Sequence, residues 1–141
     1  MNLLRLPHLV HSPSPTHNLV LAVSVAVAGA LGALARNLLN DAMAHRVRSD
    51  FPYGILTINL AGSFALGLLT GMALYHGLST DALLIAGTGV CGGFTTWSTS
   101  IWETLQLLRL RLFAQTALHT LGGVAIAVGL AAAGIALAGL A

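Results

Sequence analysis

Residues 92–100, GGFTTWSTS, bring two adjacent glycines and five hydroxyl side chains into the middle of an uncharged run, 82–102. That run is about as long as a helix must be to cross a bilayer, yet residues 91–100 within it contain none of the Leu, Ile and Val that fill an ordinary spanning helix. Adjacent glycines are also a place where a helix is easily broken. Because unpaired backbone groups are tolerated in lipid only where protein or a polar cavity satisfies them, we expect this stretch to line a small polar pathway.

The polar groups near this stretch favour a small anion as the species that passes. Asn59 lies in another apolar segment, and its amide offers two donors and one acceptor. Taken alone, such a residue is more typical of a helix–helix hydrogen bond, but beside the hydroxyl groups a pathway role becomes the better interpretation. Hydroxyl and amide donors can replace the water of a hydrated anion, and the edge of the Trp97 ring adds positive charge density. A break at Gly92 and Gly93 also frees backbone carbonyls that can hold a small cation.

Charged residues divide the chain into apolar segments. The chain is 56% hydrophobic and only 7% charged, with six arginines, no lysine and four acids. Four membrane spans are predicted between these charges, at about 19–39, 52–75, 82–108 and 112–138. We therefore expect an all-α membrane protein with four transmembrane helices, the third of them broken, in one channel domain over 19–141.

Residues 1–18 contain three prolines and are predicted to form a loose tail. Together with the start of the first span they imitate a secretory signal, but the apolar segment continues past the small residues where cleavage would fall. No residue pattern supports catalysis, so we do not expect an enzyme. We also do not expect nucleic-acid binding, because the arginines do not form a clustered basic face.

Small residues four apart recur in every predicted span. Examples are Gly67 with Gly71 in the second span, and Gly89 with Gly93 in the third. The fourth span repeats the spacing at Ala125, Gly129 and Ala133. This spacing lets helix backbones approach closely in lipid, and it predicts a compact bundle that forms a dimer.

Single polar residues elsewhere in the spans leave alternatives open. Arg36, at the end of the first span, is either an interfacial anchor or a source of positive potential for an anion. Glu103 pairs with Arg36 or Arg109, or simply lies at the membrane interface. His119 is expected to be a neutral packing and hydrogen-bonding residue, because no metal-ligand partners lie at useful spacing.

Three motifs carry a resemblance to a known family. They are 29–36 (GALGALAR), 54–67 (GILTINLAGSFALG) and 87–99 (GTGVCGGFTTWST), and their order and spacing match as well. From about residue 19 to 134 the chain resembles the CrcB-type (Fluc) fluoride channels. The resemblance implies small four-helix subunits that pair antiparallel, with their broken third helices crossing at the centre. It also implies two fluoride pathways at the dimer interface and a structural sodium ion between the subunits.

The resemblance assigns pathway roles to five residues. Asn59 matches the pore asparagine of the second helix, and Ser98 and Thr99 would lie on the polar track. Trp97 and Ser100 occupy the two positions at which the family usually has pore phenylalanines. By the same resemblance these five residues form the fluoride pathway of this subunit.

Three further residues receive roles beside the pathway. Gly92 and Thr95 would give backbone carbonyls to the central sodium ion. Arg36 matches the arginine of the family's first helix and would attract the anion. All three assignments rest on the resemblance alone.

The chain departs from the family at several pathway positions. Trp97 is bulkier than phenylalanine, and Ser100 loses the second aromatic ring. On the fourth span, Gly123 stands where the family carries a pore serine, and Ala127 where it commonly has threonine or serine. At least one pathway lined by this subunit therefore lacks its usual ligands.

The arginines are unevenly shared between the two ends of the spans. Arg46, Arg48, Arg109 and Arg111 lie in the first–second and third–fourth connections, whereas the other side has only Arg5. The positive-inside rule then places both termini outside the cell. A subunit that inserts in both orientations should carry balanced loops, so we expect a fixed-orientation half of a heterodimer whose partner is an oppositely inserted paralogue.

The sequence thus predicts a passive, fluoride-selective channel subunit in a prokaryotic plasma membrane that lowers cytoplasmic fluoride. One alternative is a non-conducting partner that only orients and stabilises a conducting paralogue. A weaker one is a small multidrug-type exporter, which requires a glutamate in the first span, where this chain has no acid.

Overall fold

The computed structural model describes residues 14–46 and 49–141, and within these ranges the chain is built of helices joined by short connections. The elements in chain order are α1 (Pro15–Arg46), α2 (Tyr53–His76), α3 (Thr80–Leu83), η1 (Leu84–Cys91), α4 (Gly92–Phe94), α5 (Trp97–Arg109), α6 (Phe113–Ala117), η2 (Leu118–Gly122) and α7 (Gly123–Ala138). The segments η1 and η2 are π-helical, and they continue the α-helices on either side. The all-α prediction is confirmed for the described residues.

Three helical stretches are long and apolar enough to cross a membrane: Pro15–Arg46, Tyr53–His76 and Phe113–Ala138. The remaining predicted span, 82–108, is helical but not continuous, because α3, η1 and α4 form one piece and α5 another. All four predicted spans therefore fall on helical segments, and the third is divided.

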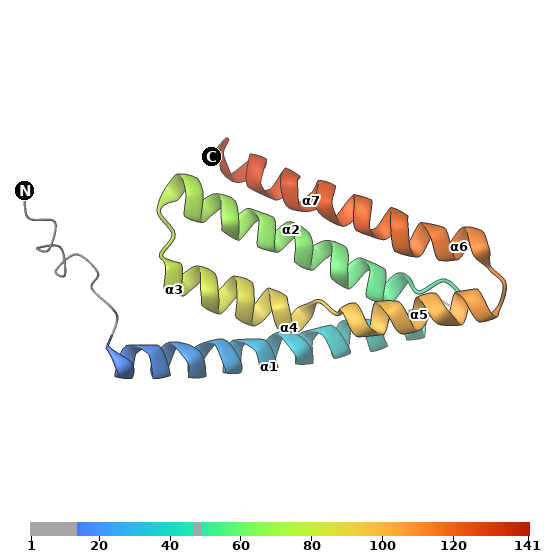
Figure 1. Cartoon of the computed structure of the whole chain (residues 1–141), viewed down its shortest axis with the longest axis horizontal. Coiled ribbons are helices and arrows are strands. Elements are labelled where there is room, and N and C mark those ends of the chain that lie inside the picture. The colour runs from blue at the N-terminus through green and yellow to red at the C-terminus, as the bar shows by residue number, and fades with distance from the viewer. Residues whose placement is uncertain (1–13, 47–48) are drawn as a thin grey trace, which may run out of the picture.

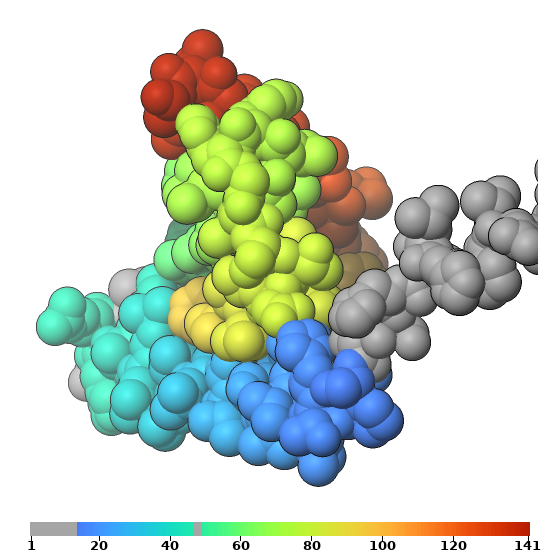
Figure 2. Space-filling view, turned by 90° about the vertical axis from the view of Figure 1, so that its left-hand side faces the viewer, coloured from blue at the N-terminus to red at the C-terminus, as the bar shows by residue number. Residues whose placement is uncertain are grey.

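Successive segments run in alternating directions along the molecule (Figure 1). The end of α1, the start of α2 and the α5–α6 turn lie at one end, and the α2–α3 connection and the C-terminus lie at the other. Both views show the order α7, α2, the η1–α4 segment and α1 (Figures 1 and 2), and the packing of α2 on α7 and of α1 on η1 and α4 agrees with it. The subunit is thus a row of helices rather than a closed bundle.

This arrangement buries few large side chains. Ile58 and Leu107 are the largest that are fully buried, whereas Trp97 is 72% and Leu121 75% exposed. Exposed apolar side chains of this size require an apolar surrounding. Lipid, or a second protein chain, must therefore cover much of the surface.

The first helix is longer than the predicted span. It begins at Pro15, whose fixed φ suits a first helical position, and the Ser14 hydroxyl accepts a hydrogen bond from the His17 backbone N–H (3.2 Å). It extends to Arg46, so the last helical turn also holds His45, a favourable position for positive charge. The predicted loose tail is therefore helical from residue 15, and its residues 1–13 lie outside the described ranges, as does Arg48.

Local signals set the turn between α2 and α3. Gly77 adopts φ 69°, a left-handed conformation that glycine accepts without strain, and it ends α2. Ser79 then caps α3, because its hydroxyl accepts a hydrogen bond from the Ala82 backbone N–H (3.2 Å). The side chains of His17 and Asp81 lie 2.9 Å apart and join the start of α1 to α3.

Glycines allow the helices of the row to touch at their backbones. A Cβ atom on Gly93 would overlap the carbonyl oxygen of Gly29 on α1, and one on Gly67 would overlap that of Ala131 on α7. The predicted close packing is confirmed at these two glycines. By contrast, no atom of the described residues lies within 4 Å of a Cβ placed on Gly129, so this member of the fourth-span set does not serve packing among them.

Candidate functional site

The third segment is interrupted at two threonines. Helix α4 ends at Phe94, Thr95 (φ −78°, ψ 158°) and Thr96 (φ −146°, ψ 125°) are extended, and α5 begins at Trp97. Gly92 itself is helical (φ −64°, ψ −39°), so the break lies beyond the glycine pair at which the sequence places it. β-Branched threonine favours extended backbone and is a good residue to start a helix, whereas Gly93 is used for close packing against α1.

Asn59 on α2 holds the interruption in place. Its Nδ2 donates to the Thr96 carbonyl oxygen (3.0 Å), and its Oδ1 accepts from the Thr96 backbone N–H (2.8 Å). In a continuous helix that N–H would bond to the carbonyl of Gly92. The amide of Asn59 therefore satisfies both backbone groups of Thr96 and releases the Gly92 carbonyl from the helical pattern.

Arg36 lies on the other side of the break. Its Nη1 donates to the carbonyl oxygen of Thr95 (3.3 Å), which also lacks a regular helical partner. Side chains from α1 and α2 thus bind consecutive carbonyls of the extended pair. The predicted role of Arg36 as an anion-attracting group remains a prediction, but its side chain is committed to the break rather than pointing freely into lipid.

The hydroxyl groups after the break form a small cluster around Thr96. Its Oγ1 accepts from the Thr99 backbone N–H (3.3 Å), which caps α5, and donates to Thr99 Oγ1 (3.1 Å). Ser98 Oγ lies 3.5 Å from the same oxygen. The predicted track residues Ser98 and Thr99 are therefore joined through Thr96.

A groove of about 560 Å³ runs between α2, the interrupted third segment and the η2–α7 segment. Five predicted site residues line it: Asn59, Gly92, Thr95, Trp97 and Ser100. The other three, Arg36, Ser98 and Thr99, are not among the described residues that line it. Among the residues that the structure describes, no carboxylate and no arginine line the groove, so its polar groups are hydroxyls, the Asn59 amide, the Trp97 indole N–H, the Cys91 thiol, backbone and one imidazole.

The imidazole belongs to His119, on η2. Its ring is 3% exposed, and its Nε2 lies 3.2 Å from the Ser100 hydroxyl oxygen. The ring of Phe51 meets it at a right angle, with centroids 5.9 Å apart. The predicted packing and hydrogen-bonding role of His119 is confirmed. Gly123 and Ala127, the two departures on the fourth span, also line the groove.

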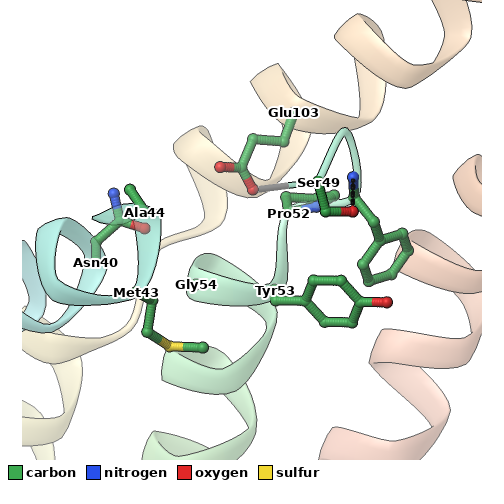
Figure 3. A pocket seen from close by; sticks show the side chains of 9 residues that line it. Asn40, Met43, Ala44, Ser49, Pro52, Tyr53, Gly54 and Glu103 are labelled. Carbon is green, nitrogen blue, oxygen red and sulfur yellow. Dashed lines mark hydrogen bonds between the residues drawn. The ribbon is translucent and has the colours of Figure 1, made fainter. Parts of the chain in front are cut away.

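Glu103 lies outside the groove, in a second pocket of about 340 Å³ between the last turns of α1 and the start of α2. Figure 3 shows its carboxylate beside Ser49 and Pro52, with Tyr53 below them. Among the described residues, its buried Oε2 has no hydrogen-bond partner. The open alternative of pairing with an arginine is not realised there, because Arg109 bonds to Gln106 and Arg36 to Thr95.

Thr96 joins the site together, although no role is predicted for it above. A threonine directly before a helical run is a readable cap signal. Its pairing with Asn59, 37 residues earlier, has no local signal. The Ser100–His119 contact was missed for the same reason, since the two residues belong to different segments.

Comparison with known proteins supports the motif-based resemblance. The sequence model of the family described as CrcB-like protein, Camphor Resistance (CrcB), matches residues 23–135. A protein of Leifsonia xyli named fluoride-specific ion channel FluC 1 is 42% identical over 86% of this chain and 89% of its own length. A protein of Haloarcula marismortui named fluoride-specific ion channel FluC 2 is 45% identical over 74% of this chain and 82% of its own length. A protein of Thermococcus onnurineus named fluoride-specific ion channel FluC is 42% identical over 84% of this chain and 95% of its own length.

Proposed function

This chain belongs to the CrcB-like family, and we propose that it is a subunit of a passive, fluoride-selective channel. Its three long apolar helices are those of a multi-pass membrane protein. The observation that carries the proposal is the groove in which Asn59 holds an interrupted helix open. An interruption of this kind is tolerated at membrane depth only where the freed groups are satisfied or line a polar cavity. The names of the relatives supply fluoride as the species that passes.

The chemistry of the groove suits a small anion that must both enter and leave. Asn59 uses one Nδ2 hydrogen on Thr96 and keeps a second for an anion. The exposed ring of Trp97 at the start of α5 offers an aromatic edge. Neutral donors replace the water of a fluoride ion without trapping it, which is the condition for conduction.

The direction of flow follows from weak-acid chemistry. From an acidic medium fluoride enters cells as neutral HF and ionises in the neutral cytoplasm, from which the anion cannot recross lipid. A selective pore in the plasma membrane lets it leave, and an inside-negative potential assists by about 2.3 kcal/mol per charge per 100 mV. This is a transport step without covalent chemistry.

The row-like subunit leaves its groove open, so a second chain is needed to close a pathway. We place the two subunits antiparallel, with the interrupted segments crossing at the centre. Arg46, Arg109 and Arg111 share one end of this subunit, which supports a fixed orientation with that end in the cytoplasm. A fixed orientation in turn favours an oppositely inserted paralogue as the partner.

A sodium ion at the centre of the dimer fits the residues present. The carbonyl of Gly92 has lost its helical donor, because the Thr96 N–H bonds to Asn59 instead. The Thr95 carbonyl accepts a hydrogen bond from Arg36 and keeps a second lone pair. These two carbonyls from each subunit would hold the ion and tie the interrupted helices together.

Removal of sodium is therefore expected to weaken the dimer. Replacing sodium with a large organic cation should lower dimer stability by about 2–3 kcal/mol if the ion normally sits at about 100 times its Kd. The dimer fraction, measured in detergent at decreasing protein concentration, reports the change, and restoring sodium should reverse it. A dimer fraction that does not depend on sodium would contradict the site.

Fluoride efflux from liposomes tests the proposed function. The chain is reconstituted alone and together with its paralogue, and Asn59→Asp serves as the blocked control. Efflux from the chain alone establishes a self-sufficient homodimer, and efflux only with the paralogue establishes the heterodimer. No efflux in either case, with folded protein, would defeat the channel assignment and favour a non-conducting assembly role.

A further inference from the structure

We propose that Ser100 and His119 form a proton-linked anion site in the groove, where the Ser100 hydroxyl binds a small anion when the His119 ring is protonated. This inference rests on the proposed channel function and adds a regulation to it. The consequence is that anion flow through this subunit increases as the pH falls.

The two side chains are placed as a built pair. Ser100 on α5 and His119 on η2 both line the groove, and Oγ and Nε2 lie 3.2 Å apart. The ring is almost fully buried, and its Nδ1 has no hydrogen-bond partner among the described residues. Phe51 fixes the ring orientation from one side.

Most other hydroxyl groups on this wall of the groove are already committed. Those of Thr95, Thr104 and Thr120 each donate to the backbone carbonyl four residues earlier, at 3.0, 2.9 and 2.7 Å. Their protons are therefore unavailable to an anion. Ser100 differs, because its hydroxyl is paired with a ring nitrogen instead of with its own helix.

The protonation state of the ring decides where the Ser100 proton points. When Nε2 is unprotonated, it accepts the Ser100 proton, and none is left for the groove. When the ring carries both protons, Nε2 must donate to the Ser100 oxygen, and the hydroxyl proton turns outward as a donor. A buried imidazolium also needs a counter-ion, and an anion at Ser100 supplies it. The proton and the anion thus favour each other's binding, as linkage requires.

Other titratable groups around the ring must be separated from this effect. They are Cys91 on η1, Glu103 one turn beyond Ser100 on α5, and Asp50 and Tyr53 on either side of the Phe51–Pro52 pair. None of them is hydrogen-bonded to the ring in the described structure. Glu103 is the strongest competitor, because its pocket is also lined by Phe51. Glu103→Gln therefore serves as the matched control.

The test is the fluoride current of the conducting assembly in planar bilayers, at equal pH on both sides between 5.5 and 7.5. Current counts the fluoride anion and ignores neutral HF that crosses the lipid. We expect the wild-type current to rise at least about fivefold on acidification, the lower end of typical coupling between two sites. His119→Gln, which can still donate to Ser100 but does not titrate, should give a flat profile, and Ser100→Ala should lose the rise as well.

Several outcomes would overturn the inference. A flat wild-type profile, or a His119→Gln profile that rises like wild type, removes the link to the ring. A rise in current that survives in Ser100→Ala but disappears in Glu103→Gln would show that the Glu103 carboxylate, and not the His119 ring, causes the pH dependence. If His119→Gln does not assemble, the smaller Ser100→Ala change decides. Absence of fluoride current at every pH defeats the channel assignment and this inference together, whereas a pH-independent current defeats only the inference.

Discussion

Asn59→Leu is expected to suppress most fluoride conduction and to destabilise the subunit. Leucine has a similar size but removes both hydrogen bonds to Thr96, so a backbone N–H and a carbonyl at the interruption lose their partners. Each unsatisfied group costs about 1–3 kcal/mol, and loss of a donor to an anion costs about 1.5–3 kcal/mol. We therefore expect the current to fall by more than about tenfold, since 1.4 kcal/mol corresponds to a factor of ten. Current in planar bilayers and thermal unfolding in detergent measure the two effects.

Two variants separate the structural and the anion-binding contributions of Asn59. Asn59→Asp keeps an acceptor for the Thr96 N–H but loses the donor to the Thr96 carbonyl and adds a negative charge, so we expect no current even where the subunit folds. Ser63→Ala is the matched control, because Ser63 lies one turn along α2 and also lines the groove. A Ser63→Ala loss as large as that of Asn59→Leu would show that the groove wall, and not the interruption, controls conduction.

Gly93→Ala is expected to destabilise the subunit by about 3 kcal/mol, the upper end of the usual cost of overpacking. The added methyl group would overlap the Gly29 carbonyl oxygen and lie 2.8 Å from its carbon. These are backbone atoms that no side-chain rotation can move, so α1 and α4 must separate. Because Thr95 follows two residues later and is bound by Arg36 of α1, the separation should also disturb the interruption. The yield of monodisperse protein and its unfolding temperature report the change.

Gly129→Ala provides the comparison for Gly93→Ala. Within residues 14–46 and 49–141 nothing lies within 4 Å of the added methyl group, and alanine is a better helix former than glycine by about 0.8–1 kcal/mol. This variant should be as stable as wild type or slightly more so. Equal losses at both positions would mean that the close approach of α1 and α4 contributes nothing to stability, or that a partner chain covers Gly129.

The positions of the helical segments could be predicted from the sequence because ten charges mark their ends. The second segment begins and ends within one residue of the predicted span. The first could not be bounded as well, since Arg46 was assigned to a connection but lies in the last turn of α1. Charges near a helix C-terminus are compatible with helix, so charge alone does not mark an end.

The interruption could be predicted to exist, but its position could not. Glycine lowers helix propensity everywhere, and Gly92–Gly93 was the strongest local signal for a break. Packing reverses this preference, because Gly93 is needed for contact with Gly29 in a helical conformation. The extended pair is instead fixed by Asn59 and Arg36, which lie 37 and 59 residues earlier. Contacts at such distances leave no periodic pattern to read.

The candidate site was predicted in composition more than in arrangement. Asn59, Trp97 and Ser100 were named from their residue types and from the family motifs, and all three line one groove. The motif order did not show that Ser98 and Thr99 join to Thr96, or that Ser100 joins to His119. The Thr96 contacts follow from its position as the cap of α5, whereas the Ser100–His119 contact depends on how α5 is rotated after the break, which the sequence does not encode locally.

The most direct test of fluoride conduction through this groove is the reversal potential of the assembled channel in a planar bilayer. The two sides hold a tenfold fluoride gradient, with chloride added to equalise ionic strength and equal sodium on both sides. We predict reversal near the fluoride equilibrium potential, about 59 mV in magnitude for a tenfold gradient of a monovalent ion. Reversal near zero, or with the sign that chloride sets, would contradict a fluoride-selective pathway.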